Sequence, residues 1–359
     1  MSCNQIPIKR LIARIFCLTV LATPAWAQGT LATPPLLQST AGPPAPADKL
    51  DDYIQSEMLK RQIPSVSLAV VQNGKVVKLK SYGLANMELN VPATTKSLYQ
   101  IQSITKSFIA CAMMLLAEDG KIGLDDKITK YLSGLPPAWT DVTIRQMLNH
   151  TSGIPSFVQD QGSGKAIVAF AQSVGSSDEI VAWAASRPMK FAPGEGRKYS
   201  STGYHLAGMI IEKVTGKPWA EFLKERIFAP LGMTSTRVNS YEDIIPNRAY
   251  GYNHFGDVPV NGLVFTPAYV ASAAGGLVSS AEDMAKWEIA LENGTILKPS
   301  TLAQMAVPVK LKNDSIVQES DGTRHGLGWD LETYNGARGY GSRRRPCEWL
   351  YGQLRPLHR

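Results

Sequence analysis

One stretch decides the fold of this chain: Leu98-Tyr99-Gln100-Ile101-Gln102-Ser103-Ile104-Thr105-Lys106. It opens an apolar run with helical spacing, so we predict a helix from Ser103 to Asp119. Ser103 and Lys106 are three residues apart, which places both side chains on one face of that helix. A Ser-x-x-Lys match occurs about once by chance in a chain of this length. A serine at a helix start is also often only an N-cap, so the surroundings must decide between the two interpretations.

The elements around this stretch predict an α+β fold. An amphipathic pattern predicts a helix from Asp48 to Arg61. Two β-rich runs, Ser65 to Val71 and Lys75 to Lys80, flank Asn73-Gly74, which favours a hairpin with a type I′ turn. Further helices are predicted at Val142–Asn149, Asp178–Ser186, Ser201–Thr215, Trp219–Phe228 and Ala281–Asn293, and strands near Ala274–Ser279 and Gly326–Leu331. A sheet interrupted by a long helical insertion is typical of an α+β fold with a helical subdomain.

The Ser103–Lys106 pair suits nucleophilic catalysis. The positive end of a helix favours an oxyanion that develops beside it, and a buried lysine amine loses its proton more easily than an exposed one. Lys106 could then act as a base toward Ser103. Tyr199-Ser200-Ser201 opens a second helix, and the Tyr199 phenol could relay a proton, while Ser201 could bind a substrate amide or Lys106. The alternative is a turn with an N-cap, in which Tyr199 only packs.

The chain resembles the serine β-lactamase-related hydrolases, most closely the branch of class C β-lactamases, D,D-carboxypeptidases and esterases. The resemblance runs from about Asp48 to Tyr340, and each motif is weak alone. The motifs that carry it are Ile101-Gln102-Ser103-Ile104-Thr105-Lys106, Leu148-Asn149-His150-Thr151-Ser152-Gly153-Ile154-Pro155, Pro193-Gly194-Glu195 with Tyr199-Ser200-Ser201, Pro230-Leu231-Gly232-Met233, Ala274-Gly275-Gly276-Leu277 with Ser280-Ala281-Glu282-Asp283-Met284, and Gly326-Leu327-Gly328-Trp329.

The resemblance implies roles for individual residues. It implies a β-lactamase/transpeptidase-like fold, in which helices flank an antiparallel sheet, with Ser103, Lys106 and Tyr199 as catalytic residues and Ser201 as a substrate-binding residue. The family more often has Asn at the position of Ser201, and a hydroxyl can still donate and accept. His150 invites a Ser–His pair, but the resemblance places it in a structural loop, and we favour that interpretation.

The third family motif, Lys-Thr-Gly or His-x-Gly, is expected just after Tyr340. The chain instead continues Gly341-Ser342-Arg343-Arg344-Arg345 and ends at Arg359. Read one base later, one choice of codons for Gly341 to Leu354 gives Gly-His-Gly-Gly. We therefore predict that residues 341–359 are an atypical tail, for which a frameshift is one explanation, and that the C-terminal part of the sheet is missing. A divergent native tail, or a basic patch that binds a partner, is the alternative.

Composition excludes several classes of protein. The formal charge of +7 comes from the two ends: residues 1–27 carry +3 and residues 338–359 carry +5, which leaves −1 for the remainder. The basic balance therefore does not indicate nucleic acid or a membrane surface. The four cysteines show no disulfide framework or metal spacing, and the five histidines form no H-E-x-x-H pattern, so we predict no metal and no cofactor.

The N-terminus predicts export. Lys9, Arg10 and Arg14 precede a short apolar run, and Ala25-Trp26-Ala27 is typical of a cleavage site, so residues 1–27 are predicted to be a Sec signal peptide cleaved after Ala27. Residues 28–46 are predicted to be a flexible linker, and residues 47–340 an incomplete hydrolase domain. No later run reaches the length of a membrane span. The expected location is periplasmic or secreted, as a monomer.

The expected function is hydrolysis of an amide or ester carbonyl through a covalent acyl-enzyme. The substrate could be a β-lactam, a D-Ala-D-Ala-type peptide or a small ester, and fold and motifs do not separate these. One alternative is a catalytically dead, truncated member that at most binds cell-wall peptide. A structural or adhesion domain is a weaker one, because Ser103, Lys106 and Tyr199 are all present.

Overall fold

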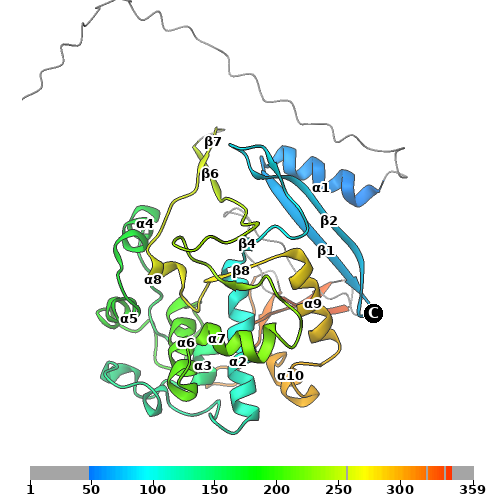
Figure 1. Ribbon diagram of the computed structural model, residues 1–359. Helices are drawn as coiled ribbons and strands as arrows, with labels where there is room; N and C mark the ends of the chain where they lie inside the picture. The colour runs from blue at the N-terminus through cyan, green and yellow to red at the C-terminus, as the bar shows by residue number, and fades with distance from the viewer. Residues whose placement is uncertain (1–47, 256–257, 321, 335–336, 342–359) are drawn as a thin grey trace, which may run out of the picture. The chain divides into compact units, whose positions relative to one another are not determined.

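Helices and short strands make up the described part of the chain, which is residues 48–255, 258–320, 322–334 and 337–341 of a computed structural model (Figure 1). The helices are α1 (Lys49–Lys60), α2 (Thr105–Glu118), α3 (Ile144–Leu148), α4 (Gly164–Ser173), α5 (Ser177–Ala185), α6 (Ser201–Thr215), α7 (Trp219–Leu223), α8 (Pro267–Val270), α9 (Ala281–Glu292) and α10 (Pro299–Met305), with 3₁₀ turns η1 (Gln102–Ile104), η2 (Ile128–Lys130) and η3 (Pro137–Trp139) and a π-helical turn η4 (Lys224–Phe228). The strands are β1 (Ser65–Gln72), β2 (Lys75–Asn86), β3 (Val91–Pro92), β4 (Tyr99–Gln100), β5 (Arg237–Val238), β6 (Tyr252–Phe255), β7 (Val258–Asn261), β8 (Leu277–Ser279), β9 (Arg324–His325), β10 (Asp330–Tyr334) and β11 (Ala337–Gly341).

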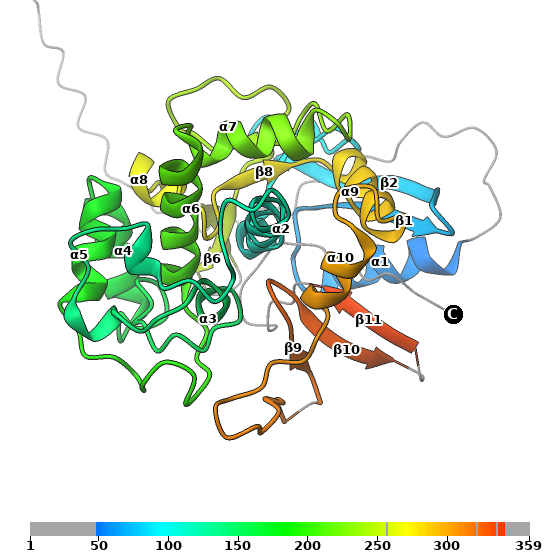
Figure 2. The same ribbon diagram turned by 90° about the horizontal axis from the view of Figure 1, so that it is seen from below.

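Helix α2 is the central element. Figure 2 views it nearly end-on, with α6 on one side and α9 on the other. Every residue from Thr105 to Leu116 is buried, so the helix is covered all round, as a helix that is apolar on every face must be. Phe108 packs against Trp287 of α9 and Phe228 of η4, at ring-centroid distances of 4.1 and 5.6 Å. The helix predicted from Ser103 to Asp119 is confirmed, with η1 as its first turn.

The N-terminal hairpin also forms as predicted. β1 pairs antiparallel with β2, and the turn residues Asn73 and Gly74 have φ angles of 53° and 68°. Both angles lie in the left-handed region that a type I′ turn requires. Lys78, Lys80 and Tyr82 alternate along β2 and contact Asp51 of α1, so the predicted first helix covers this face of the hairpin.

The remaining strands form short antiparallel sheets. Their orders are β4-β8-β5, β11-β10-β9 and β6-β7. β4 pairs with β8, and the backbone N–H of Ile101 donates to the carbonyl of Leu277 at 2.9 Å. This pairing places the residues before the nucleophile motif beside the Ala274-Gly275-Gly276-Leu277 segment, which is 170 residues away in sequence.

Most predicted elements lie within one or two residues of their expected bounds, and four do not. β2 continues to Asn86, six residues beyond the prediction, and β8 begins only at Leu277. The second half of the predicted helix Trp219–Phe228 is the π-helical turn η4. The strand predicted from Gly326 begins only at Asp330, because Gly328 has a φ of 81° and lies so close to α2 that a Cβ there would be 2.5 Å from that of Ala110. In the described ranges, no helix is both long and apolar enough to cross a bilayer. The predicted signal peptide, the predicted linker and the tail from Ser342 lie outside the described residues. The prediction that the C-terminal part of the sheet is missing therefore stays a prediction.

Candidate active site

Ser103 sits in the turn η1 and does not cap a helix. The N-cap positions of η1 and α2 are Ile101 and Ile104, and neither helix start has a side-chain cap. Gln102, directly before Ser103, has a φ of 45°, in the left-handed region that residues other than glycine rarely adopt. The capping interpretation of Ser103 is therefore wrong, and a disfavoured backbone conformation presents this side chain.

The structure brings the three predicted catalytic residues together. The Nζ of Lys106 lies 3.3 Å from the Oγ of Ser103, and the hydroxyl of Tyr199 donates to the same Oγ at 2.9 Å. Ser103 and Tyr199 are separated by 96 residues in sequence. The side-chain oxygen of Ser103 is thus within hydrogen-bond reach of an amine and a phenol, the geometry that a serine nucleophile needs for proton transfer.

Lys106 is held from several sides. Only 4% of the residue is exposed, and its ammonium donates to the carbonyl of Ala274, in the glycine-rich segment before β8. Its Nζ lies 5.0 Å from the ring centroid of Tyr199 and 5.6 Å from that of Tyr204. These contacts aim the amine at Ser103 and fix its rotamer, which a general base requires.

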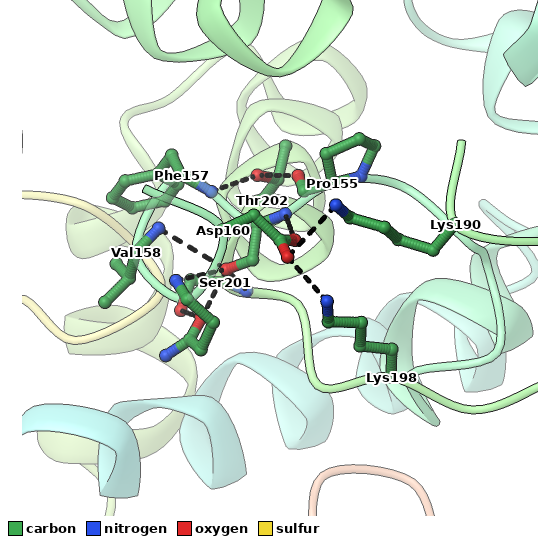
Figure 3. Close-up of polar contacts among 10 residues, drawn as sticks. Pro155, Phe157, Val158, Asp160, Lys190, Lys198, Ser201 and Thr202 are labelled. Carbon is green, nitrogen blue, oxygen red and sulfur yellow. Dashed lines mark hydrogen bonds and ion pairs between the residues drawn. The ribbon is translucent and has the colours of Figure 1, made fainter. Parts of the chain in front are cut away.

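Tyr199 is positioned by the start of α6. Ser200 is the N-cap of this helix, and its hydroxyl accepts from the backbone N–H of Gly203 at 3.4 Å. The ammonium of Lys198 lies 2.6 Å from a carboxylate oxygen of Asp160, which also binds Lys190 at 3.2 Å (Figure 3). The N-cap of the alternative interpretation is found at Ser200, but Tyr199 does more than pack, because its hydroxyl donates to Ser103. The catalytic role of Tyr199 stays a prediction.

Ser201, the first residue of α6, bonds the loop after Pro155. It is 3% exposed, and its hydroxyl donates to the side-chain oxygen of Gln159 at 3.2 Å. Its backbone N–H donates to the hydroxyl of Ser156 at 3.0 Å, so Ser201 is tied to the loop that follows the Ile154-Pro155 motif (Figure 3). The hydrogen bonds of Ser201 do not lead to Lys106, and its predicted contact with substrate stays a prediction.

A small pocket opens over Ser103. Its walls come from α2, the end of α3, the start of α6 and the segment between β9 and β10. The residues that line it are Ser103, Lys106, Leu148, His150, Tyr199, Tyr204, His325, Gly326, Gly328, Trp329 and Asp330. Gly326, Gly328 and Trp329 of the last motif therefore form one wall of the site. Gly328 allows the backbone to approach α2, and Gly326 allows it to approach Met305 of α10.

Sequence reasoning missed a charged network in this wall. The Nδ1 of His325 lies 2.7 Å from a carboxylate oxygen of Asp330 and 2.9 Å from the Nη2 of Arg197, and the Nη1 of Arg197 donates to Glu319 at 2.7 Å. His325 is 5% exposed. Only its place directly before the Gly326 motif could have drawn attention to it, because Arg197 is 128 residues away and no motif marks the nearby Asp330 and Glu319.

His150 also lies in the pocket, although sequence reasoning assigned it to a structural loop. Burial lowers the pKa of His150 well below its usual value, and the charges of Arg197, Lys106 and His325 lower it further. The imidazole is therefore neutral at neutral pH. In the described part of the chain, no group of three or more His, Cys, Asp or Glu side chains could hold a metal ion.

Comparison with known proteins gives a consistent result. The beta-lactamase family model matches residues 50–349. Penicillin-binding protein 4* of Bacillus subtilis (strain 168) is 32% identical over 290 residues, which are 76% of this chain and 60% of the relative. This chain thus spans less than two thirds of that relative's length.

Solved structures agree with this match. A D-amino acid amidase from Ochrobactrum anthropi SV3, complexed with L-phenylalanine, superposes with a TM-score of 0.70 at 32% identity, over 81% of this chain and 84% of the amidase. An octameric penicillin-binding protein homologue from Pyrococcus abyssi superposes with a TM-score of 0.69 at 31% identity, over 82% of this chain and 67% of the homologue. The β-lactamase/transpeptidase-like α+β fold expected from the sequence is confirmed.

Proposed function

This chain belongs to the beta-lactamase family, and from that premise we propose that it is a serine hydrolase that forms a covalent acyl-enzyme on Ser103. One observation carries the proposal: the Oγ of Ser103 lies 3.3 Å from the Nζ of Lys106 and 2.9 Å from the hydroxyl of Tyr199. These two groups are the means by which a serine hydroxyl can lose its proton and a leaving group can gain one.

The proposed reaction has two halves. In the first, the Oγ of Ser103 bonds to the carbonyl carbon of the substrate, while its proton passes to whichever of Lys106 and Tyr199 is unprotonated. The bond from that carbon to the leaving nitrogen or oxygen then breaks, and the leaving group takes up the proton. In the second half, water attacks the carbonyl carbon of the ester on Ser103 and gives a proton to the same pair. The bond from that carbon to the Oγ of Ser103 then breaks, Oγ takes the proton back, and the carboxylic acid is released.

The oxyanion needs backbone donors. Ser103 lies in the first turn before α2, where N–H groups have no partner within the helix, and the positive end of the helix dipole favours negative charge there. A second donor would come from the strand that carries the third family motif. That motif is expected after Tyr340, and residues from Ser342 lie outside the described residues.

The substrate class is proposed from the relatives. A penicillin-binding protein and a D-amino acid amidase favour an amide carbonyl, in a β-lactam, in a D-Ala-D-Ala-type peptide or in an amino acid amide. The same chemistry would hydrolyse a small ester. Ser201 stays a proposed substrate contact, which would require its hydroxyl to exchange Gln159 for a substrate amide.

Location and assembly are also proposals. The pattern of residues 1–27 supports export to the periplasm or the medium, with a small molecule or peptide as the partner. A monomer is the simplest expectation for this chain, although the homologue from Pyrococcus abyssi is octameric.

Labelling with a fluorescent penicillin or a fluorophosphonate, followed by mass mapping, tests the proposal. We expect the label on Ser103, and none in Ser103→Ala. Ser107→Ala is a matched control, because Ser107 is a buried serine one turn further along whose hydroxyl donates to the carbonyl of Ile104. Label that persists in Ser103→Ala would refute the assignment. Absence of label in the unaltered chain would favour the alternative, a family member that only binds its ligand.

A further inference from the structure

His150 makes contacts that its assignment to a structural loop does not explain. It follows α3, lies 8% exposed and lines the pocket over Ser103. Its φ is 65°, so its backbone adopts the left-handed conformation that is unfavourable for most residues other than glycine. Such conformations persist where the surrounding contacts require them, and these contacts lie on the segment that carries Tyr199.

His150 contacts three consecutive residues, Lys198, Tyr199 and Ser200. Its carbonyl accepts the backbone N–H of Lys198 at 3.0 Å, and its Nδ1 accepts the backbone N–H of Ser200 at 3.1 Å. Between them, its ring lies against the ring of Tyr199, with centroids 4.3 Å apart and an angle of 35° between the planes. One residue, His150, thus contacts the tyrosine ring and the backbone on both sides of it.

We propose that His150 is the positioning residue of Tyr199, and that it holds the phenol on Ser103 through its contacts with the tyrosine ring and with the backbone on both sides of it. This rests on the proposed function, in which Tyr199 moves a proton to or from Ser103. His150 acts through Tyr199 and is not itself the base, because its Nδ1 is occupied by the N–H of Ser200 and the Oγ of Ser103 contacts Lys106 and Tyr199.

The charge state follows from the groups around the ring. Because the Nδ1 of His150 accepts the N–H of Ser200, it carries no proton in this structure. Protonation of Nδ1 would place its N–H against the N–H of Ser200, two donors facing each other. The charged groups that act on His150 are Lys106 of α2, Arg197 before α6 and His325 of β9, and the rings of Tyr199 and Tyr204 cover it. Burial and this positive surrounding both oppose protonation of His150.

Two substitutions distinguish the effect of the His150 ring on Tyr199 from the effect of its hydrogen bond with Ser200. His150→Phe keeps a ring against Tyr199 and removes the acceptor for Ser200. His150→Asn removes the ring, but asparagine tolerates a positive φ and offers an oxygen to the N–H of Ser200. We expect His150→Phe to slow acylation roughly tenfold or more without changing initial binding, because the loss falls on the transition state. We expect His150→Asn to retain more of the acylation rate.

A double-mutant cycle provides the decisive test. If His150 acts through Tyr199, His150→Phe should have no further effect on acylation in the Tyr199→Phe background. His205→Phe is the matched control: it is also a buried histidine, 6% exposed, but it bonds Ser177 and Ser272 instead of the Tyr199 segment. Its acylation rate should stay within about twofold of the unaltered chain, since remote substitutions are usually additive and small. Equal losses from His150→Phe with and without the Tyr199 hydroxyl would overturn the proposal.

The proposed function and this inference can fail separately. If Tyr199→Phe acylates normally, the role of Tyr199 is wrong. The position of its ring is then measured directly, from the NMR signal of ¹³Cζ-labelled tyrosine, assigned by its loss in Tyr199→Phe. We expect this signal to move in His150→Asn, because a ring 4.3 Å away has been removed, and to stay in place in His205→Phe. An unmoved Tyr199 signal in a folded His150→Asn protein would overturn the inference even for a chain that takes no label.

Discussion

Helix α2 and the hairpin β1–β2 are the two elements that the sequence indicated most strongly, and they differ in how the fold uses them. Twelve residues of α2 in succession are buried, from Thr105 to Leu116. In the twenty hairpin residues only Ser65, Tyr82, Ala85 and Asn86 are buried, and Val77 is 58% exposed. The strength of a local signal thus does not indicate how far an element is buried. The nucleophile lies at the start of the buried element, where close packing fixes side-chain positions.

The largest expected difference between the two regions is in stability. Phe108→Ala removes a ring with no exposed surface that packs between Trp287 and Phe228, and should lower the free energy of unfolding by about 3–5 kcal/mol. Val77→Ala in the hairpin should stay within about 0.5 kcal/mol, because Val77 is mostly exposed. Urea denaturation of both variants measures this. If both variants lost a similar free energy of unfolding, Val77 would have to be buried in solution.

Substitution of one lysine in each region compares their importance for the acylation rate. Lys106→Ala should slow acylation by about 10² or more, as expected for losing a positioned base. Lys78→Ala is the matched control, because Lys78 is a partly buried lysine of β2 whose partner is Asp51, away from Ser103. Its rate should match that of the unaltered chain in the same penicillin-labelling time course. An unchanged rate in Lys106→Ala would remove this residue from the mechanism.

The contact between the regions should depend on pH. Glu288 of α9, the helix that packs on β1, is 6% exposed, and its Oε1 has no hydrogen-bond partner among the residues that the structure describes. Burial, followed by repulsion from Glu292, raises the pKa of Glu288 from 4.5 to about 7. A raised pKa favours the protonated form in the folded state, so this contribution to stability is present below pH 4.5 and is lost as the pH rises through about 7.

Glu288→Gln should remove that dependence. Between pH 5 and 8, we expect the unaltered chain to lose about 2 kcal/mol relative to Glu288→Gln, which keeps a neutral side chain of the same shape. Glu282→Gln, at the start of the same helix and bonded to Thr95, is the control. The measurement is denaturant unfolding at each pH. A constant difference between the unaltered chain and Glu288→Gln would show that Glu288 is solvated.

The sequence by itself determined the α+β class, the hairpin and the helices that begin near Ser103 and at Ser201, because hydrophobic periodicity, Asn-Gly and cap residues are local signals. It also named Ser103, Lys106 and Tyr199. It did not predict α4, α8, α10 or the β6–β7 hairpin, where the elements are short or the pattern is weak. It also did not predict that the segment before Asp330 would pack against α2 and form a wall of the pocket.

Only the tertiary structure decided which side chains meet. The distance between Tyr199 and Ser103, the bond from Ser201 to Gln159, and the network of His325 with Arg197 and Asp330 all join residues that are far apart in the chain or belong to different elements. The same holds for His150, whose loop the motif indicated but whose ring faces Tyr199 only because α3 and α6 pack together. Local patterns encode the backbone conformation of a segment. The approach of two segments depends on the burial of their apolar faces, which is a property of the whole fold.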